Sequence, residues 1–474
     1  MNFAGWSVSL SILFLVYLPN RFNVGWKFEA FGWEWYPTDL LIPILLVSAC
    51  LSEPGHRLGT AIRRSPAVFG WFMGWVLAAL FSTLLSNGEP GLKERGLAAL
   101  TADFVWTLPI LLIPILDLRK KDLYGILWVY LLLGALGGIL AMAQSLAVRE
   151  FSSLVGWKYV HYVTDSERRA DLPLGVSTVI GAFFATVLPI GFALAVRPGK
   201  MFLRWVGAAA VFLVGMGCLF TSSRATLLLL ILVSGLCALW LVWPKGSKLL
   251  PTLALTGLAV TIVVALSQLN FQRLTTFSGG YGSSEWRMRG IESALDMIRD
   301  SPIIGHGTET HFARQHGPVH GYFSTSKAHD AIYYDNRIAP SDPHNLFLLI
   351  ASEWGLLGLF FYLGMLAQIG YWFYRAQENA VDPMDRLLMR GFLIGLLGVM
   401  FHSLFGSDLV RQTRMAPLFW IYCGIGIRFG AILIEERVRS GAAAGGSRSP
   451  ESHTPQGWES EALRLDPKSQ VSNG

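Results

Sequence analysis

The stretch Ser341-Asp342-Pro343-His344-Asn345 leads directly into a long apolar run that starts at Leu346 and continues to about residue 374. The length of this run predicts a membrane-spanning helix, because about 20 apolar residues cross a bilayer. His344 therefore stands where a polar loop enters a membrane helix. An ionisable group at such a boundary is costly and is a functional candidate by default, so His344 is the first candidate for a catalytic residue.

The composition of the whole chain indicates a membrane protein. Hydrophobic residues make up 53% of the chain and charged residues 15%, whereas soluble domains carry about 25% charged residues. The apolar runs are continuous rather than alternating, which favours helices over a β-barrel. We therefore predict an all-α polytopic membrane protein with about 12 transmembrane helices. The apolar runs are residues 3–18, 38–52, 67–86, 97–116, 123–148, 173–196, 202–220, 223–243, 249–268, 344–374, 387–406 and 415–434.

The basic residues predict the orientation. Loops that follow even-numbered helices carry clusters such as Arg119-Lys120-Lys121 and belong in the cytoplasm. Both termini are then cytoplasmic. Residues 1–268 are predicted to hold transmembrane helices 1–9, residues 269–343 one long extracytoplasmic loop, residues 344–435 helices 10–12, and residues 436–474 a disordered tail. Some arginines nevertheless fall on the outer side, where an anionic ligand would explain them: Arg168, Arg169, Arg224, Arg287, Arg289, Arg411 and Arg414.

The outer loop contains one predicted helix and one predicted turn. Apolar residues recur at helical spacing over 286–299, which predicts an amphipathic helix that Ser283 can cap. Ser301-Pro302 then ends it. The glycines Gly305 and Gly307 predict a turn that permits close approach by a backbone or a ligand.

The sequence predicts neither a metal site nor a nucleic-acid interface. The loop histidines His306, His311, His316 and His320 do not share one face of a regular helix, so we interpret them as solvated loop residues. All four cysteines lie inside apolar segments, which indicates neither a disulfide framework nor a zinc site. The net charge of +6 is spread over many loops rather than gathered in a stripe.

Three stretches in this order resemble the O-antigen ligase and polymerase superfamily of bacterial membrane glycosyltransferases. The first is Thr221-Ser222-Ser223-Arg224-Ala225 at the start of an apolar helix. The second is Arg287 followed by Pro302-Ile303-Ile304-Gly305-His306-Gly307, although Arg289 competes with Arg287 for the position of the family arginine. The third is His344-Asn345 followed by the Glu-x-Gly-x-x-Gly that begins at Glu353. The resemblance covers roughly residues 210–375.

This resemblance implies that a glycan moves from undecaprenyl diphosphate to an acceptor hydroxyl on lipid A–core or another glycan. The departing diphosphate needs fixed cations, and arginine pairs phosphate oxygens bidentately, so Arg224 and Arg287 are the catalytic arginines. A neutral histidine suits the general base, which is His344, with Asn345 or Asp342 to orient it. The predicted substrate-binding residues are Arg289, Asn345, Gly305, Gly307, Arg411 and Arg414. The resemblance implies no metal and no cofactor, and a location in the bacterial inner membrane, with the site facing the periplasm or exterior.

A continuous helix over 344–374 would also place small residues beneath the histidine. At about 100° per residue, His344, Ala351, Gly355 and Gly358 share one face. Glu353 lies on the opposite face, and we expect it to tie this helix to a neighbour.

Two other readings stay open. A polymerase of the same superfamily shares these motifs. A small-anion transporter, for example for bicarbonate, would be expected to show internal repeats or charged and broken helices in the membrane, whereas the predicted helix interiors are nearly free of charge.

Overall fold

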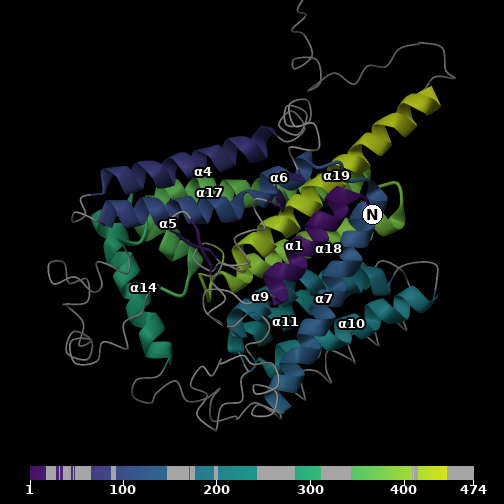
Figure 1. Cartoon of the computed structure of the whole chain (residues 1–474), viewed down its shortest axis with the longest axis horizontal. Coiled ribbons are helices and arrows are strands. Elements are labelled where there is room, and N and C mark those ends of the chain that lie inside the picture. The colour runs from purple at the N-terminus through teal and green to yellow at the C-terminus, as the bar shows by residue number, and fades with distance from the viewer. Residues whose placement is uncertain are drawn as a thin grey trace, which may run out of the picture.

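A computed structural model describes residues 1–17, 28–30, 33–35, 44–45, 47–48, 66–86, 92–146, 170, 174, 177–196, 201–221, 223–242, 283–310, 343–407, 409 and 415–445. Helices dominate this part of the chain (Figure 1). They are α1 (Phe3–Tyr17), α4 (Pro66–Leu85), α5 (Leu92–Thr107), α6 (Pro109–Ile115), α7 (Lys120–Leu146), α9 (Ser177–Ala195), α10 (Met201–Phe220), α11 (Arg224–Cys237), the π-helix η2 (Ala238–Val242), α14 (Ser283–Asp300), α17 (Leu346–Asn379), α18 (Pro383–His402) and α19 (Met415–Gly445). A short antiparallel hairpin of β1 (Phe28–Ala30) and β2 (Trp33–Trp35) is an addition to the predicted all-α fold.

Seven spans within the described residues are long and apolar enough to cross a bilayer. They are formed by α4, the α5–α6 pair, α7, α9, α10, α17 and α19. The predicted helices at α1 and α11 are present but shorter. The predicted run 249–268 lies outside the described residues. The structure therefore confirms a helical membrane protein, while the number twelve stays a prediction.

A proline divides the span that the sequence predicts as one helix over 97–116. Helix α5 ends at Thr107, and α6 begins at Pro109, which occupies its first helical position. Proline is tolerated there because its missing N–H would have no partner in the first turn.

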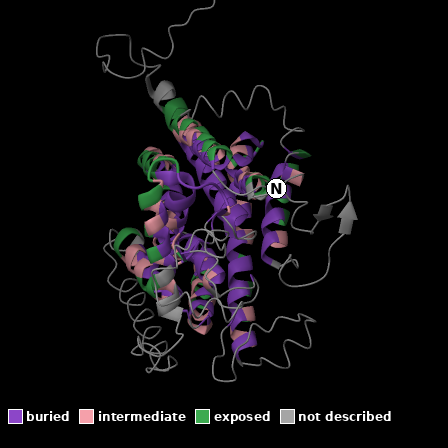
Figure 2. Ribbon diagram, turned by 90° about the vertical axis from the view of Figure 1, so that its left-hand side faces the viewer, coloured by how far each residue is buried: buried purple, intermediate pink, exposed green. Residues whose placement is uncertain are grey.

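The helices form a bundle in which α9 and α19 are the most buried spans and α10 is among the least buried. Helix α4 runs beside α17, and α9 packs against α10, α11 and α18 (Figure 1). Figure 2 shows buried residues along the central helices and exposed residues on the outer faces and toward the end of α19. Helix α19 includes residues 436–445, so this part of the predicted disordered tail is helical.

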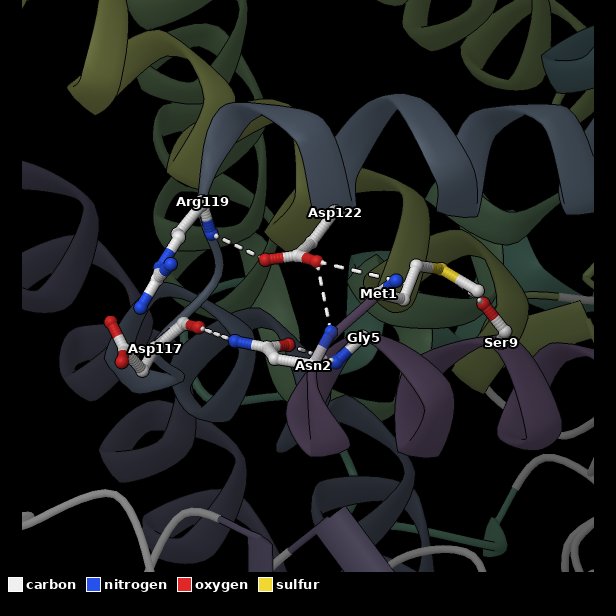
Figure 3. A network of polar contacts seen from close by, with 7 residues as sticks. All are labelled: Met1, Asn2, Gly5, Ser9, Asp117, Arg119 and Asp122. Atoms are coloured by element: carbon white, nitrogen blue, oxygen red, sulfur yellow. Dashed lines mark hydrogen bonds and ion pairs between the residues drawn. The ribbon is translucent and has the colours of Figure 1, made fainter.

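A polar network holds several helix ends together at one end of the bundle. The Asp122 carboxylate accepts from the backbone N–H of Asn2 at 2.9 Å and lies 3.9 Å from the amine of Met1 (Figure 3). Beside it, the Lys120 ammonium lies 2.6 Å from the Asp385 carboxylate and 2.8 Å from that of Glu436. The starts of α1, α7 and α18 therefore meet the final third of α19 here. We call this the Lys120 end and the opposite end of the bundle the His344 end.

Candidate functional site

The start of α17 is fixed by Asn345. The Asn345 side-chain oxygen accepts from the backbone N–H groups of Phe347 at 3.0 Å and Leu348 at 3.1 Å. Its side-chain nitrogen donates to the carbonyl of Leu404 at 3.2 Å, just beyond α18. This is an N-cap, which satisfies backbone donors that have no partner within the helix. Asn345 thus positions the residue before it, His344, which is exposed and has a φ of 47°.

Helix α17 is broken at Gly355, which has a φ of 71° and a ψ of 178°. The expectation of one continuous helix with His344, Ala351, Gly355 and Gly358 on one face is therefore wrong. His344 precedes the helix, and the break changes the direction of everything before it. Only glycine adopts this backbone conformation readily, because a Cβ would collide with neighbouring backbone.

The loop after α14 fills this break. The N–H groups of Leu356 and Leu357 donate to the carbonyls of Pro302 at 2.8 Å and Ile303 at 3.3 Å. In return, Gly307 donates its N–H to the carbonyl of Glu353 at 2.7 Å. Backbone groups that the break releases are thus paired by another segment, as a low-dielectric environment requires.

The same loop joins α17 to α4. The Ser82 hydroxyl donates to the Glu353 carbonyl at 2.6 Å and receives the Gly307 N–H at 3.0 Å. Thr308 donates its N–H to the Thr83 hydroxyl at 3.2 Å. The backbone of Glu353 therefore connects α17 to α4, and a tie through its side chain stays a prediction.

The break also explains how α17 reaches α18 at both ends. The 34 residues of α17 would extend about 51 Å in a straight helix, whereas the 20 residues of α18 extend about 30 Å. Yet Arg386 donates to the carbonyl of Ala380 at 3.0 Å at the Lys120 end, and Leu346 donates its N–H to the carbonyl of Ser403 at 2.9 Å at the other. Residues 346–354 must therefore turn back across the bundle, which brings His344 to the end of α18.

The last residue of α18, His402, connects three elements at this point. Its ring is buried, hydrogen bonds the backbone of Thr178 in the first turn of α9, and lies close enough to Arg287 for their charges to interact. Arg287 comes from α14 and is half-buried. The turn after His402 accepts the N–H of Leu346. Arg287 and His344 therefore approach the same end of α18 from different parts of the chain.

Arg224 lies at the His344 end as well. It is half-buried and begins α11, where the Ser223 hydroxyl caps the helix by accepting the Thr226 N–H at 3.4 Å. Helix α11 packs tightly on the start of α9, because a Cβ on Gly181 would lie 2.9 Å from the Thr226 Cβ. The prediction that Arg224 opens a helix is confirmed.

The structure gives the two loop glycines a packing role. Gly305 and Gly307 are buried, with φ values of 78° and 94°. A Cβ on Gly307 would lie 2.9 Å from the Ser86 Cβ, and one on Gly305 would meet the backbone of α17. They allow the loop to enter the break in α17, and substrate binding by either glycine stays a prediction. The backbone of Arg289 lies in α14, its side chain lies outside the described part, and Arg411 and Arg414 are outside the described residues.

Among the described residues, no group of three or more His, Cys, Asp or Glu side chains could hold a metal ion. His306 is buried, and its Nε2 lies 2.9 Å from the carbonyl of Met297, so it is a packing residue rather than the solvated one predicted. The other three loop histidines lie outside the described residues. The described site is thus two half-buried arginines and an exposed histidine, a set suited to an anion and a proton transfer.

Sequence reasoning missed His402 and Thr178. A single histidine at the end of an apolar run carries no periodic signal, and neither residue belongs to a stretch that carries the family resemblance. Their significance comes from packing of α9 against α18, which brings together residues far apart in the chain.

Comparison with known proteins agrees with this geometry. A search of curated proteins finds no match to the chain. Residues 208–363 match the family model described as O-antigen ligase. This region contains Arg224, Arg287 and His344, and the match supports the O-antigen ligase superfamily.

Proposed function

We propose that the protein transfers a glycan from undecaprenyl diphosphate to an acceptor hydroxyl at the outer face of the bacterial inner membrane, in the manner of an O-antigen ligase. The matched domain supports a membrane glycosyltransferase of the O-antigen ligase or polymerase type. The observation that carries the proposal is the meeting of Arg287 and the His344-bearing start of α17 at the end of α18. The acceptor is lipid A–core or another glycan.

The two arginines would stabilise the leaving group. As the bond between the anomeric carbon and the diphosphate breaks, negative charge grows on the diphosphate oxygens, and a fixed guanidinium lowers the energy of that state. One such donor contributes about 3–4 kcal/mol. Arg224 has an added advantage, because it lies in the first turn of α11, where backbone N–H groups favour anions.

His344 would accept the proton of the acceptor hydroxyl. The hydroxyl oxygen forms a bond to the anomeric carbon, its proton passes to the His344 imidazole, and the electron pair of the broken bond leaves with undecaprenyl diphosphate. A general base of this kind contributes about 10²–10⁴ in rate. The exposure of His344 supports this role, because the acceptor must reach the imidazole. The reaction as proposed needs no metal.

The broken helix α17 invites comparison with transporters, which bind their cargo at such breaks. In this protein the N–H groups of Leu356 and Leu357 and the carbonyl of Glu353 bond to the loop after α14. These backbone groups are hydrogen-bonded to the protein itself rather than open to an ion. The break therefore serves better to position the start of α17 than to bind an ion.

The test is the fate of lipid-linked glycan in cells that carry His344→Ala, Arg224→Ala or Arg287→Ala at normal expression. Arg299→Ala is the matched control, because Arg299 lies on α14 but is exposed and paired with Asp296. We expect each site variant to reduce transfer by 10²-fold or more, at the lower bound of about 10²–10⁴ for a lost base or donor. The control should transfer normally.

The accumulating donor separates the alternatives. Polymerised glycan on undecaprenyl diphosphate indicates a ligase, and single repeat units indicate a polymerase. Normal transfer in all three site variants would contradict the catalytic assignment and would make anion transport the next function to test.

A further inference from the structure

Helix α14 crosses the end of the bundle instead of spanning the membrane. It is not among the spans that are apolar enough to cross a bilayer. Figure 1 shows it running across the ends of α4 and α17 rather than alongside them. The loop that follows it is hydrogen-bonded to both of those helices. A helix in this position lies along the surface of the membrane.

The break in α17 fixes the depth of that loop. Residues 356–379, which follow the break, lead to the Lys120 end and extend about 36 Å as a helix. This length crosses the hydrocarbon core, which is about 30 Å thick. Leu356 and Leu357 therefore stand at the opposite boundary of the bilayer. Because their N–H groups bond to the carbonyls of Pro302 and Ile303, the loop after α14 lies at that boundary too.

Apolar side chains are exposed on both the helix and the loop. On α14, Met288 is 57% exposed and Leu295 is 40% exposed. In the loop, Ile303 is 66% exposed and Ile304 is 42% exposed. The carbonyl of Ile303 bonds to Leu357, whose side chain is itself exposed on a membrane span. The apolar surface of the loop therefore continues the lipid-facing surface of α17.

The sequence of α14 separates these apolar residues from its charges. Around the helix, counted at about 100° per residue from Met288, four charged residues fall between about 20° and 120°. They are Glu292, Asp296, Arg299 and Asp300. We call this the charged arc. In the other direction from Met288, apolar residues cover about 180°. They are Met288, Leu295, Ile291, Ile298, Ala294 and Met297.

The protein covers only part of this apolar arc. Ala294 and Met297 are fully buried, Ile291 and Ile298 are half-buried, and the two residues next to the charged arc are exposed. An apolar strip thus lies between the surface that packs on the bundle and the surface that carries the charges. This is the arrangement of an amphipathic helix at a membrane interface, with its charges in water and its apolar side in the acyl boundary.

We propose that α14 and the loop after it contact the bilayer at the His344 end, with Met288, Leu295, Ile303 and Ile304 among the acyl chains. The partner of this surface is membrane lipid, and the charged arc faces water. Because Arg287 belongs to α14, the contact also fixes the depth of its backbone in the membrane. Contact with the bilayer does not require that the protein transfer a glycan.

The test is the depth of nitroxide spin labels in the full chain, in nanodiscs of phosphatidylethanolamine and phosphatidylglycerol. Labels are attached to Met288→Cys, Leu295→Cys or Ile303→Cys. Cys50→Ala is present throughout, since the other three cysteines are buried, and that variant alone gives the labelling background. Depth follows from relaxation by oxygen, which partitions into lipid, relative to relaxation by a nickel chelate, which stays in water.

Two further labels calibrate the measurement. Phe360→Cys is the lipid-facing reference, because Phe360 is exposed on the span formed by α17. Glu292→Cys is the matched control on α14, because Glu292 is exposed on the charged arc. The melting temperature of each labelled variant confirms folding.

We expect the labels at Met288, Leu295 and Ile303 to lie about 5–10 Å inside the boundary between headgroups and acyl chains. Oxygen should relax them more than the nickel chelate does, as at Phe360. The label at Glu292 should be relaxed mainly by the nickel chelate. This change of environment between neighbouring turns of one helix is expected only if one side of α14 faces lipid.

Two results would overturn the proposal. If the nickel chelate relaxes the label at Met288, Leu295 or Ile303 as strongly as the one at Glu292, that part of the surface lies in water. If a label is shielded from oxygen and nickel alike, another part of the protein covers it. Neither result bears on glycan transfer, which the variants of Arg224, Arg287 and His344 test separately.

Discussion

Replacing Gly355 with alanine tests whether the loop after α14 shapes the site. Gly355 has a φ of 71° and a ψ of 178°, and four backbone hydrogen bonds connect the loop to the two sides of the break in α17. A Cβ at this position would overlap the carbonyl of Ile303 and lie 2.6 Å from the carbonyl carbon of Ile304. Because both obstacles are backbone atoms, neither can rotate away, and the loop itself has to move.

The expected loss of stability follows from two contributions. A residue other than glycine in this conformation costs about 1–3 kcal/mol. Each loop hydrogen bond that is lost costs about 1 kcal/mol. Displacing only two of the four bonds therefore gives a total of about 3–5 kcal/mol.

The assay compares Gly355→Ala with Gly370→Ala in the same helix. A Cβ on Gly370 would meet Leu396 at 3.5 Å and Leu393 at 3.6 Å, which are ordinary contacts. Alanine is also favoured over glycine in a helix by about 0.5–1 kcal/mol. In purified protein in detergent, we expect a lower melting temperature and reduced glycan transfer for Gly355→Ala, and wild-type behaviour or slight stabilisation for Gly370→Ala.

Transfer by Gly355→Ala at the wild-type rate would refute the role of the break in positioning His344. Equal melting temperatures for the two variants would refute the collision with the loop as well. A loss of transfer without loss of stability would mean that α17 straightens and carries His344 away from the end of α18.

Three further substitutions have defined outcomes. Asn345→Ala should destabilise the protein by about 1 kcal/mol through loss of the N-cap, whereas Asn345→Asp keeps the acceptor and should melt near the wild type. Lys120→Ala should lower stability by about 3–5 kcal/mol, because it leaves the buried Asp385 carboxylate without its cation, and Lys121→Ala, at an exposed neighbour, should not. Gly181→Ala should lower the melting temperature, because its Cβ would press on a threonine side chain of α11 and separate α9 from α11.

The sequence predicted the elements that carry the candidate site. The helical spacing over 286–299 corresponds to α14, and the apolar run that begins near residue 223 corresponds to α11, with Arg224 at its first position. Such elements are predictable because their signals are local. A periodic apolar face or a capping serine acts within a few residues of the helix end it specifies.

The break in α17 was not predictable in the same way. Gly355 stands inside an apolar run, and hydropathy reports whether a segment is buried, not whether it continues in one direction. What stabilises the break is a loop whose sequence begins about fifty residues earlier, at Pro302. The prediction that His344 and Gly355 lie on one helix face was wrong for this reason, because the rotation of about 100° per residue can be summed only along an unbroken helix.

The location of the arginines has an electrostatic explanation that also unifies the site. Helices α9, α11 and α17 all begin at the His344 end, because Thr178, Thr226 and Leu346 contact neighbours there in their first turns. Each helix start carries a positive partial charge, which the end of α18 offsets in part, and Arg224 and Arg287 add two full positive charges. A bundle that gathers positive charge at one end reduces its own stability unless an anion neutralises that charge. The positive-inside rule alone leaves these arginines as exceptions. Two arginines at the same end give the exceptions a common cause, because a diphosphate bound there would interact favourably with both.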